Sequence, residues 1–332
     1  MTGCISLLIA AAFAYGRRWT VPRPPIGVFR SSDLVFMTVM VVAAPLLYLH
    51  LPGTFVAAVF GLVGLVAVQA TLAPVMGGRA GLLAATALCA GTFAAWASGH
   101  SLPTRVFSDA VLAIAVVGVG NLWVQGGLRA GQVAAFSSVL TGYDLIATTM
   151  TDVTHRFAAH VQGLPFAPVF ELAGGHTPVS IGLGDLVMLA VFPLAMDKAF
   201  GRRAGIAAAA TGVAVCAGVG MLFVAGAADS SLPLLTVLGP VIVTQYVVRR
   251  RSVARERRVV EWRSQTAAPA RPTGPAPAVS AALAVAIPEW VSAGDWMAID
   301  GDRVVGVGSA PGLARKDARE RGCLAVPVVR QR

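Results

Sequence analysis

Charged residues and cysteines are scarce in this sequence. Only 13% of its 332 residues are charged and 56% are apolar, whereas in soluble domains about a quarter of the residues are charged. A water-soluble chain of this length could not bury so much apolar surface in one or two cores. The four cysteines are scattered without a CxxC pair, so neither a zinc site nor a disulfide framework is indicated. Composition therefore excludes an ordinary cytosolic enzyme, a disordered chain and a secreted disulfide scaffold.

Recognisable soluble-enzyme motifs are also missing. No P-loop, dinucleotide-binding glycine pattern or serine-protease signature is present. The histidines and acids between residues 152 and 176 match no strong metal-binding spacing, so we expect no metal and no cofactor. Residues 249–332 carry 15 basic and 8 acidic residues, a net charge of +7, against +3 for the first 248. Basic flanks of membrane spans explain this charge better than a nucleic-acid partner does.

Long apolar segments dominate the first 248 residues, which is typical of helices that span a lipid bilayer. The segments predict an all-α polytopic membrane domain over residues 1–248. They number nine, at residues 2–15, 33–50, 53–73, 81–98, 108–125, 131–150, 178–196, 204–227 and 231–248. With nine spans, every basic cluster falls on one face, and the other face holds only Arg105 and Arg156. The positive-inside rule then predicts an outer N-terminus and a cytoplasmic C-terminus.

The remaining chain divides into two parts. Residues 249–287 form a basic juxtamembrane segment, expected to be helical over 249–263, and an Ala/Pro-rich linker over 264–287. Residues 288–332 predict a small α+β cytoplasmic module, with a hairpin at 300–302, a helix over 311–321 and a last strand over 323–329.

Two carboxylates lie well inside expected spans. Only eight acids occur in the first 248 residues, and six of them fall in loops or at span ends. Asp144 and Asp185 lie about 10 Å below the outer ends of the sixth and seventh spans, at ~1.5 Å per residue. Because an ionisable group at such a depth costs several kcal/mol, it indicates function.

Adjacent carboxyls in an apolar setting tend to share one proton. This is the working state of an aspartic protease, in which one carboxyl activates water and the other donates to the scissile carbonyl. A proton site in a transporter, or a single buried acid in a scaffold, is an alternative. The two acids alone favour the transporter over the protease.

The residues around the acids change that preference. Asp144 follows Tyr143 in a YD pair, and Asp185 ends a GxGD pattern whose two glycines are Gly182 and Gly184. This arrangement resembles the presenilin and signal peptide peptidase family of intramembrane aspartyl proteases, which has nine spans with its aspartates on the sixth and seventh. The resemblance implies that Asp144 and Asp185 are catalytic. Tyr143 and the two glycines would shape the site.

A third family motif, Pro-Ala-Leu at the start of the ninth span, has the imperfect counterpart Pro233-Leu234-Leu235. The resemblance implies that these residues bind substrate, although a simple span-start proline explains them equally well. The expected orientation matches signal peptide peptidase, which implies cleavage of transmembrane segments or signal peptides within the bilayer. The Ala-, Gly-, Arg- and Val-rich composition indicates a bacterial plasma membrane.

Two further resemblances are weaker. GxGD also occurs in prepilin peptidases, but those usually have a lysine soon after the aspartate, where this chain has Leu186, Val187 and Met188. The tail resembles a small bacterial domain of unknown function, and this resemblance implies no chemistry. The residues that carry it are Trp290, Gly294, Trp296, Ala298, Ile299, Val304 and Val305.

Overall fold

The computed structural model divides into two compact units, residues 1–266 and 267–332. It describes residues 2–21, 31–151, 153–171, 180–225, 234–253, 255–257, 259, 261–262, 291–292, 294–300, 303–321, 323 and 328–331. The first unit is a helical bundle and the second is a small unit of strands and one helix. The 264–287 segment, expected to be a linker, lies outside the described residues.

Each of the nine apolar segments contains a helix. The helices are α1 (Thr2–Arg18), α2 (Ser31–Tyr48), α3 (Gly53–Met76), α4 (Gly78–Ala97), α5 (Ser101–Gln125), α6 (Ala130–Thr149), α8 (Leu183–Phe200), α9 (Arg202–Val224) and α10 (Leu234–Ser252). A further short helix, α7 (Val153–Val161), is bent by 85° from α6. At each of two helix junctions, α3–α4 and α8–α9, one glycine with a positive φ separates the helices: Gly77 with φ 90° and Gly201 with φ 101°. Only glycine adopts such backbone angles without strain.

Among the described residues, four helices are long and apolar enough to cross a membrane, α3, α4, α5 and α9. A fifth is added if α6 and α7 form one broken span. The remaining helices are shorter or more polar: α1 has 17 residues, and α8 carries Asp185, Asp197 and Lys198 within 18 residues. Large apolar side chains point outward from the bundle, such as Phe36, 66% exposed, and Leu83, 71% exposed. Exposed apolar area on this scale indicates a membrane protein.

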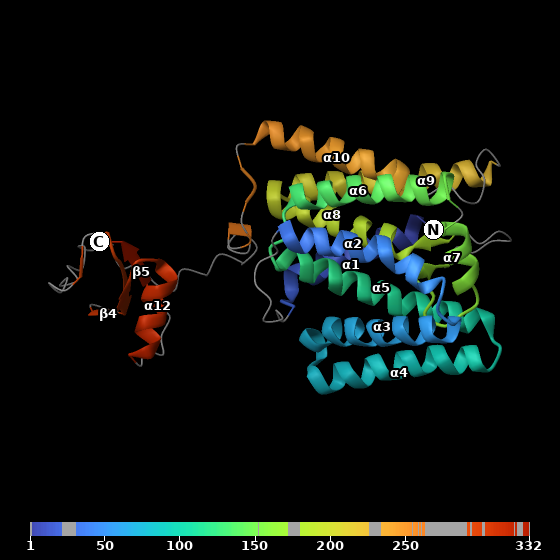
Figure 1. Ribbon diagram of the computed structural model, residues 1–332, viewed down its shortest axis with the longest axis horizontal. Helices are drawn as coiled ribbons and strands as arrows, with labels where there is room; N and C mark the ends of the chain where they lie inside the picture. The colour runs from blue at the N-terminus through green and yellow to red at the C-terminus, as the bar shows by residue number, and fades with distance from the viewer. Residues whose placement is uncertain are drawn as a thin grey trace. The chain divides into compact units, whose positions relative to one another are not determined.

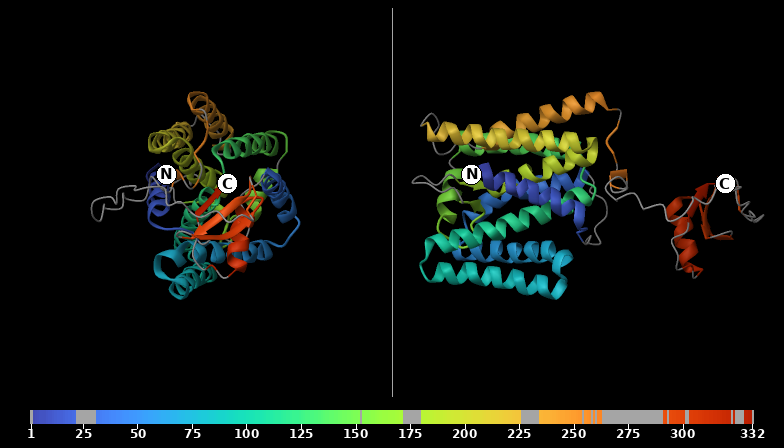
Figure 2. Two further views of the ribbon diagram at one scale, coloured as in Figure 1. Left: turned by 90° about the vertical axis from the view of Figure 1, so that its left-hand side faces the viewer. Right: turned by 180° about the vertical axis from the view of Figure 1, so that it is seen from behind.

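Helix α8 is the centre of the first unit. Every residue from Met188 to Ala199 is buried, and α8 contacts α1, α5, α6, α9 and α10. Its run of apolar residues has no polar face, which is typical of a helix surrounded by other helices. The pairs α3–α4 and α6–α10 lie toward opposite edges of the bundle (Figures 1 and 2).

A small strand pair precedes α8. Strand β1 (Val169–Phe170) pairs antiparallel with β2 (Ile181–Gly182), and the Leu183 N–H donates to the Pro168 carbonyl at 3.0 Å. The seventh segment was expected to be helical from residue 178, but the helix begins only at Leu183. The pairing of β1 with β2 holds residues 181 and 182 extended.

The second unit is a three-stranded antiparallel sheet with one helix. Strands β3 (Trp296–Asp300), β4 (Arg303–Gly308) and β5 (Val328–Gln331) have the order β4-β3-β5. The predicted hairpin is confirmed by the β3–β4 pairing, although its turn residues 301 and 302 lie outside the described part, as does Trp290. Helix α12 (Pro311–Glu320) confirms the predicted helix. The expected last strand, 323–329, overlaps β5 at residues 328 and 329, and residues 324–327 lie outside the described part.

Small residues bring α12 close to the sheet. Ala298, Ala314 and Ala318 are fully buried at the contact. A Cβ on Gly306 would overlap the backbone of α12. The Val307 N–H donates to Asp317 Oδ2 at 2.8 Å, so Asp317 links the helix to β4.

The basic segment after α10 is not one continuous helix. Helix α10 ends at Ser252, and the chain returns toward the bundle. We call residues 255–262 the return segment. The Arg257 N–H donates to the Ala199 carbonyl at 3.1 Å, and the Trp262 indole donates to Asp197 Oδ2 at 3.2 Å. The return segment therefore packs on the C-terminal end of α8.

Candidate active site

The two predicted catalytic acids lie on helices that contact each other. Asp144 lies in the last two turns of α6, and Asp185 lies in the first turn of α8. Both side chains are half-buried, and the two carboxyls interact electrostatically. The antiparallel packing of α6 and α8 thus brings together two acids that are 41 positions apart in the chain.

Helix α8 presents Asp185 differently from the expected arrangement. We expected Asp185 about seven residues inside a helix, whereas α8 begins only two residues before it. Gly182 is the N-cap residue, and the backbone of Gly182 and of Leu235 is close enough to the Asp185 carboxyl to interact with it. Within the described residues, Asp185 Oδ1 is buried and has no hydrogen-bond partner.

The two motif glycines differ in their surroundings. A Cβ on Gly182 would lie 3.3 Å from Asp185 Oδ2, so a side chain there would push on the acid. A Cβ on Gly184 would meet nothing within 4 Å. Gly182 therefore allows the close approach expected of it, and Gly184 borders open space.

The start of α10 contacts both acid-bearing helices. The Thr141 hydroxyl on α6 donates to the Leu235 carbonyl at 3.1 Å, and the Leu235 backbone also faces Asp185. Leu234 and Leu235 are buried, whereas Pro233 lies outside the described residues. Of the three residues predicted to bind substrate, Leu235 is thus brought close to Asp185 through its backbone.

Gly239 permits this close contact between α6 and α10. A Cβ on Gly239 would overlap the Thr141 hydroxyl. Sequence reasoning missed both residues as parts of the site. Two features of the sequence could have indicated this contact: Thr141 lies close to the YD pair, and Gly239 lies one helical turn after Leu235.

Tyr143 is half-buried and interacts electrostatically with the neighbouring Asp144. Among the described residues its hydroxyl has no hydrogen-bond partner, so its site-shaping role stays a prediction.

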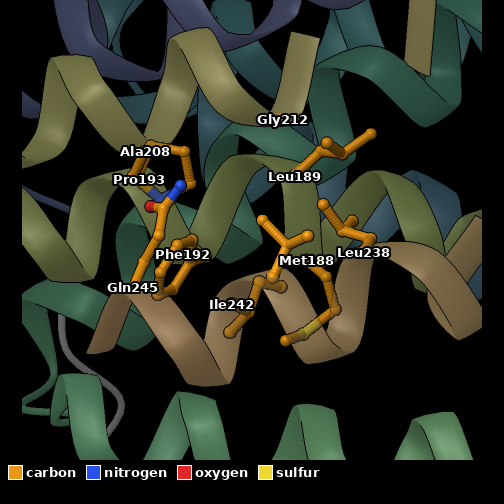
Figure 3. Close-up of a pocket in the computed structure, with 10 residues that line it drawn as sticks. Met188, Leu189, Phe192, Pro193, Ala208, Gly212, Leu238, Ile242 and Gln245 are labelled. Carbon is orange, nitrogen blue, oxygen red and sulfur yellow. The ribbon is translucent and has the colours of Figure 1, made fainter. Parts of the chain in front are cut away.

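An apolar cavity lies beyond the acids, between α8, α9 and α10 (Figure 3). Its volume is about 10 Å³, and its lining includes Met188, Leu189, Gly212, Leu238 and Ile242. This volume matches the space for about one water molecule, but a water needs two to four polar partners. Its lining offers few polar groups, so we regard the cavity as a packing space between helices.

Among the residues that the structure describes, no three His, Cys, Asp or Glu side chains are grouped so as to hold a metal ion. His160 contacts the Leu51 carbonyl at 3.0 Å instead. Asp152 and His176 lie outside the described residues.

A second polar cluster lies at the other end of α8. Lys198 is only 2% exposed, and its ammonium donates to the carbonyls of Val124 and Leu128, just at and beyond the end of α5. Glu256 of the return segment accepts the N–H groups of Ala130 and Gly131, both at 3.1 Å. Positive charge at a helix C-terminus and negative charge at a helix N-terminus are both stabilising. Glu256 and Lys198 also attract each other.

Comparisons of the chain with models of known protein families, with curated proteins and with solved structures found no match. The resemblance to the presenilin and signal peptide peptidase family therefore depends on the short motifs and on the helices that carry them.

Proposed function

We propose that this chain is an intramembrane aspartyl endopeptidase of signal peptide peptidase type, with nine spans and with Asp144 and Asp185 as its catalytic pair. The observation that carries the proposal is that α6 and α8, the helices that bear these two acids, contact each other, with Asp144 near the end of α6 and Asp185 at the start of α8. Helices at all nine apolar segments, and basic clusters on one face of the expected topology, support the span count.

The chemistry needs the two acids and one water. One carboxylate accepts a proton from the water, whose oxygen adds to the carbonyl carbon of the scissile bond. The protonated partner donates to the carbonyl oxygen. The tetrahedral intermediate then breaks its C–N bond as a proton passes to the departing amine, and the new carboxyl and amine ends leave. No metal or cofactor takes part in this scheme.

Substrates are single transmembrane segments or signal peptides, locally unwound so that a carbonyl reaches the acids. The buried Oδ1 of Asp185 has no hydrogen-bond partner among the described residues, so it is free to accept a hydrogen bond from the reacting water. Open space beside Gly184 supports access of a peptide backbone. The protein resides in a bacterial plasma membrane, with its N-terminus outside and its C-terminus in the cytoplasm.

The test compares the wild type with Asp144→Asn and Asp185→Asn in liposomes that contain a tagged transmembrane substrate. Each variant should abolish cleavage, whereas Asp33→Asn at the start of α2 should retain it. Labelling by a transition-state analogue should need both acids. Uncleaved substrate with the wild type, together with proton-linked uptake of a solute, would instead indicate a transporter.

A further inference from the structure

Asp109 is a buried acid that the proposed chemistry does not use. It lies on α5 and is 1% exposed. Its Oδ1 accepts the backbone N–H of Glu171 at 3.0 Å. Since burial of a carboxylate is costly unless the group is hydrogen-bonded, Asp109 and the backbone of Glu171 hold each other in place.

Glu171 directly follows β1, which is paired with the strand that leads to Asp185. In this pair Phe170 lies opposite Ile181, and Val169 lies opposite Gly182. The first residue of α8, Leu183, also donates its N–H to the Pro168 carbonyl. A series of backbone hydrogen bonds therefore connects Asp109 to the turn that carries Asp185.

Such a short strand pair needs external support. Isolated two-stranded hairpins are at best marginally stable in water, and here each strand has two residues. Two other contacts also link this region to α5. The Phe166 N–H donates to Ser108 Oγ at 3.3 Å, a long bond between neutral groups, whereas hydrogen bonds to charged groups are stronger. Arg105 pairs with the Glu171 carboxylate at 2.9 Å, but its side chain is 49% exposed, and exposed ion pairs contribute little.

We infer that Asp109 is a positioning residue for Asp185. Its hydrogen bond to the Glu171 N–H fixes β1, and β1 fixes β2 and the first turn of α8. The acceptor oxygen is the important feature of Asp109, and the side chain of Glu171 is not required. The effect on turnover depends on the proposed function, whereas the anchoring of the strand pair does not.

The experiment uses the full chain in liposomes and three substitutions. Asp109→Leu removes the acceptor at similar size, and Asp109→Asn keeps an acceptor oxygen. Glu171→Gln is the matched control, because it removes the ion pair with Arg105 and leaves the backbone N–H in place. Cleavage of the tagged transmembrane substrate gives kcat and KM. Hydrogen exchange over residues 168–183 reports the strand pair without any need for activity.

Asp109→Leu should lower kcat about tenfold or more with KM within about twofold, because misplacing an acid affects the chemical step more than substrate binding. It should also speed exchange of the Leu183 amide about tenfold, since opening of the strand pair exposes that N–H. Asp109→Asn should stay within about threefold of the wild type and Glu171→Gln within about twofold in both measurements, since the hydrogen bond to the Glu171 N–H is kept.

Unchanged kcat and exchange in Asp109→Leu would overturn the inference. If that variant does not fold, Asp109→Asn decides the question: a tenfold loss of kcat with wild-type exchange would show that the charge matters and the acceptor does not. If the wild type cleaves nothing but the exchange pattern is as expected, the anchoring stands and the protease proposal fails.

Discussion

Replacing Glu256 tests the polar cluster at the C-terminal end of α8. In Glu256→Ala, the N–H groups of Ala130 and Gly131 lose their carboxylate acceptor, and the buried Lys198 loses the attraction of the Glu256 carboxylate. Removal of a helix N-cap costs about 1 kcal/mol. A hydrogen bond to a charged group contributes about 1.5–3 kcal/mol. Glu256 accepts two such bonds and Lys198 keeps two carbonyl acceptors, so we place the total loss at about 3 kcal/mol.

A loss of about 3 kcal/mol corresponds to a fall in Tm of roughly 6–12 °C for a unit of this size. The assay is thermal unfolding of the full chain in detergent micelles, followed by the helical circular dichroism signal. Glu261→Ala is the matched control from the same segment. Its carboxylate pairs with Arg255 at 2.9 Å, where the side chains are 36% and 67% exposed, so it should cost at most about 1 kcal/mol.

Equal Tm shifts in the two variants would refute the electrostatic role of Glu256.

The same cluster affects the choice of fusion point for a topology reporter. A fusion after Arg251 would delete the return segment, whereas a fusion after Thr266 retains it together with the whole first unit. We expect the second fusion to be the better folded and to report a cytoplasmic C-terminus.

Three other predictions follow from close contacts. Gly182→Ala should lower the kcat of cleavage about tenfold by displacing Asp185 from its productive geometry. A kcat equal to that of the wild type would contradict this. Gly184→Ala should leave the Tm unchanged, because a Cβ there meets no neighbouring atom. Gly239→Ala should destabilise the fold by about 1–3 kcal/mol through overpacking, and adding Thr141→Ala should restore part of the Tm; no recovery would refute the contact. In the second unit, the Val307 N–H and Arg321 lower the pKa of Asp317. Stability from this group is therefore present above its ordinary pKa of 3.8 and is lost as the pH falls through the lowered value. Asp317→Asn should flatten the dependence of Val307 amide exchange on acid pH, and an unchanged dependence would contradict the reasoning.

The sequence predicted where the helices lie because apolar runs and glycine or charged breaks are local signals. The hairpin and helix of the second unit were predicted for the same reason. The span count is a proposal, since within the described part of the chain only four helices meet the length and apolarity of a span on their own, or five if α6 and α7 form one span. Helix α8 is an example. It carries three charged residues and is surrounded by other helices, so its amino-acid composition reflects contacts with protein as well as with lipid, and hydropathy alone does not identify it as a span.

Contacts between distant segments could not be predicted from local patterns. The sequence identified Asp144 and Asp185, but their interaction depends on how α6 packs against α8. The start of α8 at Leu183 depends on pairing with Val169 and Phe170, a strand of two residues that is too short to produce a recognisable strand pattern in the sequence. The return segment was expected to be a plain basic helix, because nothing local indicates that Glu256 meets the start of α6.

The start of α8 at Leu183 bears on how the proposed hydrolysis would obtain its water. Hydrolysis consumes a water for every peptide bond, and hydrocarbon supplies almost none. Asp185 lies in the opening turn of its helix, directly after an extended backbone. Asp185 Oδ1 itself is buried, but the neighbouring Gly184 is exposed. We therefore expect water to approach this carboxyl past the start of α8 and not through the buried stretch from Met188 to Ala199.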